Sequence, residues 1–129
     1  MTALLLDTHA WVWSLMAPEM LSDAARSAIL GADAVMVSPI SFYEIGQKVR
    51  LGKWPEMLPH ADRLDRLLAE QGGISAPFTP AIALHASLRD WAHRDPFDRM
   101  LASTAELAGL TLVSRDPVFG DLPAVGCLW

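Results

Sequence analysis

Residues 4–11 have the sequence Leu4-Leu5-Leu6-Asp7-Thr8-His9-Ala10-Trp11, and this stretch decides the fold. Three leucines end abruptly at a carboxylate. A short apolar run with such a break is typical of a strand buried on both faces, as in a parallel sheet. Ligands of open α/β sheets bind outside the carboxyl ends of the strands, so Asp7 is expected at a functional edge. Aspartate also caps helices, and this stretch alone does not separate the two roles.

Length and composition narrow the class of protein. The 129 residues predict one domain, residues 1–129, and 52% hydrophobic residues are enough for a sizeable core. No apolar run is long enough to span a membrane, and no basic segment precedes the leucines, so we expect neither a membrane span nor a signal peptide. The only cysteine, Cys127, excludes an internal disulfide, and we expect it to pack as a small hydrophobic residue. These features suit a reducing cytoplasm.

The net charge of −5 argues weakly against nonspecific binding to nucleic acid. Five acids, however, are candidates for a metal site: Asp7, Glu44, Asp95, Asp98 and Asp116. Without them, ten acidic and ten basic residues remain, so the rest of the chain is balanced. A bound divalent cation would offset part of the excess.

Predicted strands alternate with predicted helices along the chain. Strands are expected at Leu4–Leu6, Ala34–Val37, Ile74–Phe78, Leu110–Val113 and, as a possible fifth, Ala124–Leu128. Helices are expected at residues 9–15, 22–30, 38–51, 60–70, 79–91 and 95–108, with a loop marked by Pro55 and Pro59 before the fourth. This alternation predicts an α/β fold with a parallel sheet between helices on both faces.

Carboxylates stand at corresponding positions of these elements. Asp7 ends the first strand and Asp116 follows the fourth, while Glu44 lies in the helix after the second. Asp95 and Asp98 begin the last helix. In a parallel sheet, strand ends and the starts of the following helices share one edge, so the acids should converge. Close carboxylates repel and raise one another's pKa values, and a hard cation such as Mg²⁺ relieves this repulsion.

Each of these acids also has a structural explanation. Glu44 precedes Lys48 by four residues, a favourable spacing for an ion pair on a helix. Asp95 suits the N-cap before a proline, and Asp98 suits the first helical turn, where it would favour the helix dipole. Asp116 could begin a turn at the proline that follows it. It is the combination of positions, rather than any one acid, that indicates a site.

Four segments together resemble the PIN-domain family, and more closely its ribonuclease toxins of the VapC type from bacterial toxin–antitoxin pairs. They are Leu4-Leu5-Leu6-Asp7-Thr8-His9-Ala10, Ser41-Phe42-Tyr43-Glu44-Ile45, His93-Arg94-Asp95-Pro96-Phe97-Asp98-Arg99-Met100-Leu101-Ala102 and Leu112-Val113-Ser114-Arg115-Asp116. The likeness covers nearly the whole chain, although Ser41-Phe42-Tyr43 is bulkier than the small residues often found there. It implies a three-layer PIN fold and RNA cleavage that depends on Mg²⁺ or Mn²⁺.

Carried over residue by residue, the family's acidic positions fall on Asp7, Glu44, Asp98 and Asp116. Asp98 is preferred to Asp95 because it directly precedes the helical run Met100-Leu101-Ala102. Asp95 is expected to act outside the direct metal ligands. Metal-held water would attack the phosphodiester while the metal acts as a Lewis acid.

Other side chains around the acids have expected supporting roles. Thr8 and Ser114 are expected to orient carboxylates. The expected phosphate contacts are Arg94, Arg99 and Arg115, for which charge balance within the acidic cluster is the competing explanation. His9 and His93 have no inferred partner, and we expect them to be structural.

The resemblance also implies partners: an RNA substrate, a small antitoxin that covers the acidic groove, and a second copy in a homodimer. Four tryptophans, Trp11, Trp13, Trp54 and Trp91, could anchor such interfaces or fill the core. Trp11 and Trp13 diverge on a helix, so we expect at least one of them to lie outside the core.

Two alternatives from other classes remain open in the sequence. A phosphoacceptor receiver domain also has acids at strand ends, but it needs a lysine after a late strand, and the last lysine here is Lys53. Arginine is a poor substitute for it. The other alternative is a catalytically idle binding module, in which the tryptophans matter and the acids do not.

Overall fold

The computed structural model describes residues 2–129 and contains a five-stranded parallel sheet. The strands are β1 (Ala3–Leu6), β2 (Ala34–Val37), β3 (Ile74–Ser75), β4 (Thr111–Val113) and β5 (Cys127–Leu128). Their order across the sheet is β3-β2-β1-β4-β5, so the leucine strand is central, with β2 and β4 as its neighbours. The predicted α/β class and parallel sheet are confirmed. Receiver domains have the doubly wound order 2-1-3-4-5 instead, so the topology excludes that alternative.

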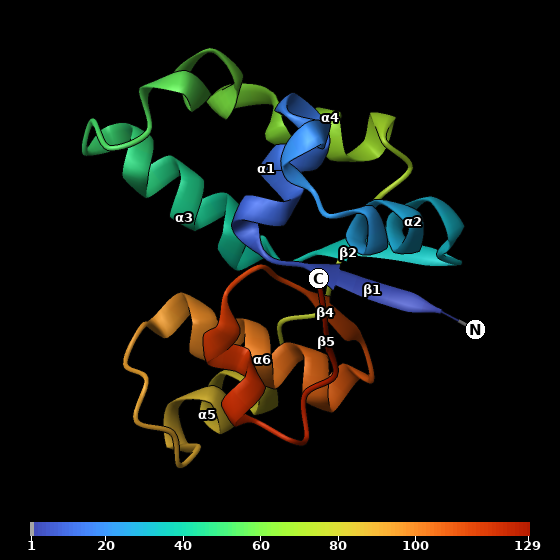
Figure 1. Ribbon diagram of the computed structural model, residues 1–129. Coiled ribbons are helices and arrows are strands. Elements are labelled where there is room, and N and C mark those ends of the chain that lie inside the picture. Colours follow the sequence, from blue (N-terminus) through green and yellow to red (C-terminus); the bar gives the residue numbers. More distant parts are fainter. Residues whose placement is uncertain (1) are drawn as a thin grey trace.

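Helices cover both faces of the sheet and make three layers. They are α1 (Thr8–Met16), α2 (Asp23–Gly31), α3 (Pro39–Arg50), α4 (Leu64–Glu70), α5 (Pro80–Leu88) and α6 (Pro96–Ala108). Short 3₁₀ helices occupy Pro18–Met20, Pro55–Arg63 and Pro117–Asp121. In Figure 1, α1 to α4 lie above the sheet and α5 and α6 beneath it. Among residues 2–129, no helix combines the length and hydropathy that crossing a membrane requires.

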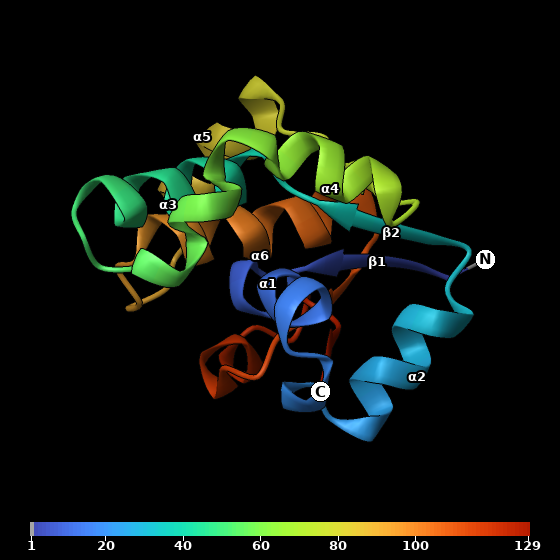
Figure 2. The same cartoon turned by 90° about the horizontal axis from the view of Figure 1, so that it is seen from above.

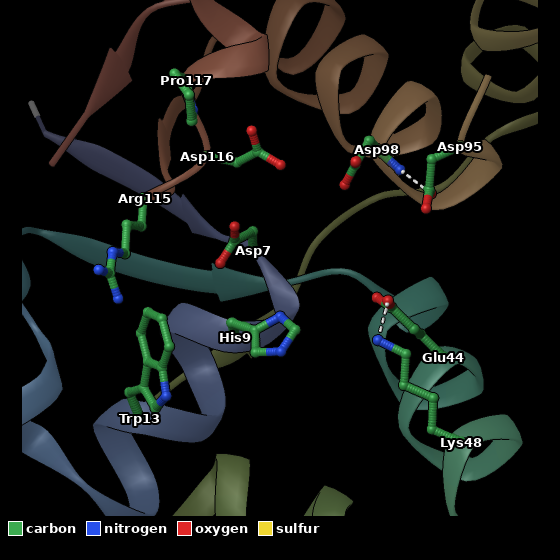
Figure 3. A pocket seen from close by; sticks show the side chains of 10 residues that line it. All are labelled: Asp7, His9, Trp13, Glu44, Lys48, Asp95, Asp98, Arg115, Asp116 and Pro117. Carbon is green, nitrogen blue, oxygen red and sulfur yellow. Dashed lines mark hydrogen bonds and ion pairs between the residues drawn. The ribbon is translucent and has the colours of Figure 1, made fainter. Parts of the chain in front are cut away.

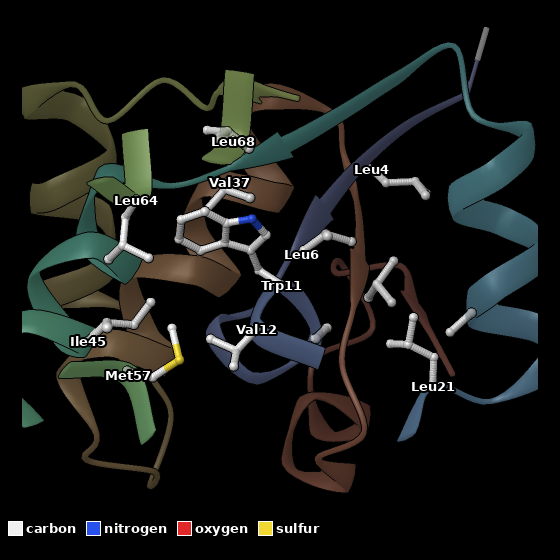
Figure 4. Close-up of a cluster of buried hydrophobic side chains, with 13 residues drawn as sticks. Leu4, Leu6, Trp11, Val12, Leu21, Val37, Ile45, Met57, Leu64 and Leu68 are labelled. Carbon is white, nitrogen blue, oxygen red and sulfur yellow. The ribbon is translucent and has the colours of Figure 1, made fainter. Parts of the chain in front are cut away.

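The side chains of β1 alternate between two hydrophobic cores, as the pleat of a strand requires. Leu4 and Leu6 pack in the cluster under α1 to α4, whereas Leu5 packs in the cluster over α6. Trp11 is fully buried in the first cluster, beside Leu6 and Val37 (Figure 4). Burial of each such side chain contributes roughly 1.5–3 kcal/mol. Both faces of β1 are therefore buried, as its leucine run predicts.

Most predicted helix starts are confirmed by their caps. The side chains of Ser22, Ser38, Thr79 and Asp95 each accept a hydrogen bond from a backbone N–H in the first helical turn. Helix α6 ends at Gly109, whose φ of 68° lies in the left-handed region that glycine adopts without strain.

Several predicted boundaries are wrong, and proline explains two of them. β3 ends at Ser75 rather than at residue 78, since Pro77 has no N–H for the sheet. Residues 55–63 form a 3₁₀ helix rather than a loop, and α4 begins only at Leu64, because Pro59 interrupts α-helical hydrogen bonding. β5 is only two residues long, Cys127 and Leu128.

Two further sequence expectations concern single side chains. Trp11 is buried while Trp13 is only partly buried, which confirms that at least one of the pair lies outside the core. The expectation for Cys127 is wrong: its residue is exposed on the edge strand β5.

The carboxyl ends of the strands lie along one edge of the sheet, and the order in which the strands are added reverses at β1. From β1 the chain builds outward to β2 and β3, then returns to the other side of β1 for β4 and β5. Figure 2 shows α3 beyond the carboxyl ends of β1 and β2, and α2 near their amino ends. Such a switch point is where α/β sheets place ligands.

Candidate active site

A pocket of about 530 Å³ opens at this switch point, and all five candidate acids line it. Its walls are Asp7, His9, Trp13, Glu44, Lys48, Asp95, Asp98, Arg115, Asp116 and Pro117 (Figure 3). The acids come from four separate segments: the end of β1, the middle of α3, the start of α6 and the turn after β4. The structure thus brings together carboxylates that are up to 109 positions apart, from Asp7 to Asp116.

Asp7 occupies the first position after β1 and has both of the roles that the sequence left open. Its backbone N–H donates to the Val113 carbonyl of β4 at 3.0 Å, and its Oδ1 accepts from the Ala10 N–H at 2.8 Å, which caps α1. Burial raises the pKa of the Asp7 carboxyl, and hydrogen bonds from Ser114 and Ala10 only partly oppose this. The nearby Glu44 carboxylate raises the same pKa further. Asp7 is therefore a partly buried acid whose charge lacks full compensation.

Asp95 and Asp116 hold their places in the pocket by capping. Asp95 Oδ1 accepts from the Asp98 N–H at 3.1 Å, and Asp116 Oδ1 accepts from the Val118 N–H at 3.0 Å. The Asp116 N–H in turn donates to the Ser114 hydroxyl at 3.1 Å. The structural explanations of these two acids are thus correct, and both carboxyls line the pocket nonetheless.

Asp98 has a partner that the sequence analysis did not infer. His93 Nε2 lies 2.7 Å from Asp98 Oδ2, in the loop before α6. Burial raises the pKa of Asp98 to about 6, with the His93 hydrogen bond lowering it and the charges of Asp95 and Asp116 raising it. The expectation that His93 lacks a partner is wrong. The sequence feature that could have predicted this contact is the five-residue spacing across Pro96. The chain must turn there and can bring the two side chains together.

Glu44 also satisfies two interpretations at once. Its Oε2 lies 3.0 Å from Lys48 Nζ, the ion pair that the four-residue spacing predicts. The Glu44 side chain is nevertheless only 12% exposed and lines the pocket together with Lys48. Lys48 also lies over the Trp54 ring, with Nζ 5.4 Å from its centroid. Glu44 is thus an acid of the pocket that is paired with a lysine.

The chemistry of the donor set fits a hard divalent cation. Within residues 2–129, no three Asp, Glu, His or Cys side chains already form a ligand cluster. Mg²⁺, however, keeps several waters and binds through one or two carboxylates, so it does not need a closed cage of side chains. Asp7 and Asp98, with their raised pKa values, gain most from a nearby cation. Asp7, Asp98 and Asp116 are the residues that would hold it.

The two hydroxyls expected to orient carboxylates behave differently. Ser114 hydrogen-bonds the Asp7 carboxyl and the Asp116 backbone, so it connects two acids of the pocket. The role expected of Thr8 is not seen, because its buried hydroxyl donates to Ser41 Oγ at 2.9 Å. Thr8 thereby ties the start of α1 to the start of α3, which carries Glu44. Its effect on the pocket is through the placement of these helices.

Arg99 is an expected phosphate contact, and its guanidinium is engaged within the fold. It donates to five backbone carbonyls, those of Ala86, Ser87, Arg89, Trp91 and His93. These carbonyls belong to the end of α5 and the loop before α6. Their use by Arg99 explains why α5 ends at Leu88 rather than at residue 91. Arg115 lines the pocket, whereas Arg94 is exposed and lies outside its lining.

We expect Arg99→Ala to destabilise the protein by about 1–3 kcal/mol, since several carbonyls lose a charged donor. Arg99→Lys should recover little, because an ammonium cannot reproduce the planar fork of donors. Urea unfolding of both variants measures the loss, with the exposed Arg94→Ala as the matched control. Wild-type stability for Arg99→Ala would contradict the role of this side chain as a clamp on the loop.

We expect Asp95→Ala to lower the stability by about 0.5–2 kcal/mol, the usual effect of a lost N-cap. Asp95→Asn should keep the cap and thereby avoid this loss. If Asp95 serves mainly as the cap, Asp95→Asn also retains RNA cleavage. Thermal melts and cleavage assays on the two variants decide the point: loss of activity in a well-folded Asp95→Asn would make Asp95 a ligand instead.

Comparisons with known proteins agree with this geometry. The family model described as "PIN domain" matches residues 4–125. Ribonuclease VapC22 of Mycobacterium tuberculosis (strain ATCC 25618 / H37Rv) is 32% identical over 117 residues, which cover 90% of this chain and 88% of that protein.

Two solved structures share the fold. VapBC2 from Rickettsia felis, bound to a DNA fragment from its promoter, has a chain that matches with a TM-score of 0.65 at 17% identity, covering 98% of both chains. A toxin–antitoxin complex from Klebsiella pneumoniae matches with a TM-score of 0.59 at 19% identity, covering 95% of this chain and 94% of the other. Together with the match over residues 4–125, the sheet order and the acidic pocket, these findings show that the chain belongs to the PIN-domain family.

Proposed function

We propose that this protein is an endoribonuclease that depends on Mg²⁺ or Mn²⁺ and acts as the toxin of a type II toxin–antitoxin pair. The observation that carries the proposal is the pocket at the switch point, where five carboxylates from four segments meet. Two of them, Asp7 and Asp98, have raised pKa values and therefore favour a cation nearby. The 32% identity to a protein named Ribonuclease VapC22 supports the same reaction class.

Each acid has a role in the proposed hydrolysis of an RNA phosphodiester. Asp7, Asp98 and Asp116 would hold the cation, which would supply Lewis acidity and activate a water. Glu44 would orient the attacking water or hold a second ion. His93 fixes the orientation of the Asp98 carboxylate through its 2.7 Å hydrogen bond. Arg115, an exposed cation on the rim, contacts a phosphate of the substrate.

The partners proposed for this chain are an antitoxin and a second copy of itself, in the cytoplasm. The matched structures are described as a VapBC2 assembly and a toxin–antitoxin complex, which supports an antitoxin here. Inhibition has a simple electrostatic basis in the pocket. An antitoxin arginine that reached Asp7, Asp98 and Asp116 would take the place of the cation.

The direct test is cleavage of single-stranded RNA by the purified protein with Mn²⁺, and its loss with EDTA. A folded protein that leaves RNA intact with Mg²⁺ and with Mn²⁺ would refute the nuclease assignment and favour an idle binding module.

The toxin role is tested separately, by expressing the protein alone and together with the product of the neighbouring upstream reading frame. Growth arrest that the neighbour relieves, and that Asp7→Asn abolishes, is the expected result. A well-expressed, folded and harmless protein would refute the toxin role while leaving the nuclease test to stand alone.

A further inference from the structure

One side of the acidic pocket is aromatic, and the proposed chemistry does not use it. His9 and Trp13 line the pocket from α1, below Asp7 in Figure 3. The His9 ring stacks on Trp54 with centroids 5.0 Å apart and planes at 26°, and it lies 5.6 Å from the Trp13 ring. Trp13 in turn lies 5.7 Å from Trp129. We call these four rings the aromatic wall.

Helix α1 positions two of the four rings next to Asp7. His9 and Trp13 are four residues apart on α1 and therefore share one face of that helix. Helix α1 begins directly after Asp7, which caps it, so His9, Trp13 and the central acid are held by the same element. Trp11 lies on another face and fills the core instead. His9 is exposed and Trp13 is partly buried, so ring surface remains open to the pocket.

The side chains of this pocket offer little positive charge for binding RNA. Five carboxylates line it, against the cationic side chains of Lys48 and Arg115. Lys48 is paired with Glu44 at 3.0 Å, and the whole chain has a net charge of −5. Nonspecific affinity for nucleic acid normally comes from neutralised phosphates, and this protein has few cations to offer near the site. Apart from the proposed cation, contacts that carry no net charge are therefore the main ones that this pocket can offer to the substrate.

We propose that the aromatic wall stacks against an unpaired nucleobase next to the scissile phosphate, with Trp13 as the main contact. Such a contact needs an unpaired base, as in single-stranded RNA or a loop, because paired bases are not free to stack on a side chain. This inference rests on the proposed nuclease function and adds to it the residues that contact the base. Stacking on aromatic rings tolerates any base, so the wall selects unpaired nucleotides rather than a particular sequence.

The test compares two substitutions of Trp13. Trp13→Leu keeps apolar bulk against the core but removes the aromatic face, whereas Trp13→Phe keeps a ring. We expect Trp13→Leu to raise KM for a short single-stranded RNA about tenfold, with kcat within about twofold, and Trp13→Phe to recover most of the loss. The matched control is Tyr43→Leu, which removes an aromatic side chain that is 63% exposed on α3, outside the lining of the acidic pocket. It should leave KM unchanged.

A binding measurement keeps this result separate from catalysis. On the Asp7→Asn background, fluorescence anisotropy of a labelled single-stranded RNA should show weaker binding when Trp13→Leu is added. An RNA with abasic nucleotides at the cleavage site should bind both proteins equally weakly. Equal affinity with and without Trp13→Leu, or no binding by either protein, would overturn the wall as a base site. Wild-type cleavage, measured in parallel, decides the nuclease function independently.

A partner that is a protein gives a different pattern in the same experiment. If Trp13→Leu leaves RNA binding intact but weakens the complex with the co-expressed antitoxin, the wall is a protein contact and our inference is wrong. A loss in Tyr43→Leu as large as that in Trp13→Leu would instead place the base on the groove between α3 and α6, where Tyr43 and Phe97 lie 6.1 Å apart. That outcome would also overturn the proposed position.

Discussion

Asp7→Asn should remove RNA cleavage while leaving the fold intact. Substitution of groups that merely orient metal ligands costs about 10–100-fold in activity or metal affinity, so the loss of a ligand itself should exceed about 100-fold. Asparagine caps helices as well as aspartate does, so the hydrogen bond from the Ala10 N–H is kept. The substitution therefore removes a charge without removing a structural contact. Cleavage rates at saturating Mn²⁺ measure the loss directly.

Metal binding gives a second, independent measure of the same substitution. Mn²⁺ should raise the melting temperature of the wild-type protein, because a ligand that binds only the native state stabilises it. The rise should be much smaller in Asp7→Asn. Ser22→Ala is a suitable control: it removes the cap of α2, away from the pocket, and should lower the melting temperature without changing the response to Mn²⁺. An Asp7→Asn protein that cleaves RNA at the wild-type rate would remove Asp7 from the site.

Local sequence signals predicted the frame of this protein well. The leucines before Asp7 predicted a buried parallel strand, and its central position follows from burial on both faces. Caps such as Ser22 and Asp95 placed helix starts correctly, because a cap depends on residues within one turn. The convergence of the acids was likewise predictable, since a parallel sheet brings its strand ends to one edge. To predict the pocket, only the topology and the positions of five acids along the chain were required.

What the sequence did not reveal depends on contacts between segments that have no fixed spacing. Arg99 resembled a phosphate ligand because it stands beside Asp98, yet its guanidinium donates to carbonyls at the end of α5 and in the loop after it. His93 seemed to have no partner because its contact with Asp98 requires the turn that this same arginine holds. Thr8 follows Asp7 but reaches Ser41, a residue 33 positions away. Thr8 was assigned to the carboxylates and Arg99 to phosphate, whereas His93 was given no partner. Tertiary packing determines the contacts of all three side chains.

Asp98→Asn should stabilise the metal-free protein at neutral pH while reducing cleavage at least as much as Asp7→Asn does. The pKa of Asp98 is raised from 3.8 to about 6 in the folded state, chiefly by burial. A raised pKa of an acid means that the folded state prefers the neutral form. The associated stability is complete below pH ~4 and is lost as the pH rises to about 6. The loss corresponds to about 3 kcal/mol at most, and asparagine, which carries no charge, avoids it.

The advantage of asparagine over aspartate should therefore depend on pH in a defined way. Urea unfolding in EDTA should show similar stability of Asp98→Asn and wild type near pH 4, a growing difference up to about pH 6, and a constant one above it. Asp7 also has a raised pKa, but it is present in both proteins and cancels in the difference.

Asp95→Asn serves as the matched control, because it removes a neighbouring charge that raises the pKa of Asp98 and should give a smaller gain of the same sign. A lower stability of Asp98→Asn throughout this pH range would mean that the 2.7 Å contact with His93, rather than burial of an uncompensated charge, dominates at this position. With saturating Mn²⁺ the order should reverse, since only the wild-type carboxylate gains from the cation.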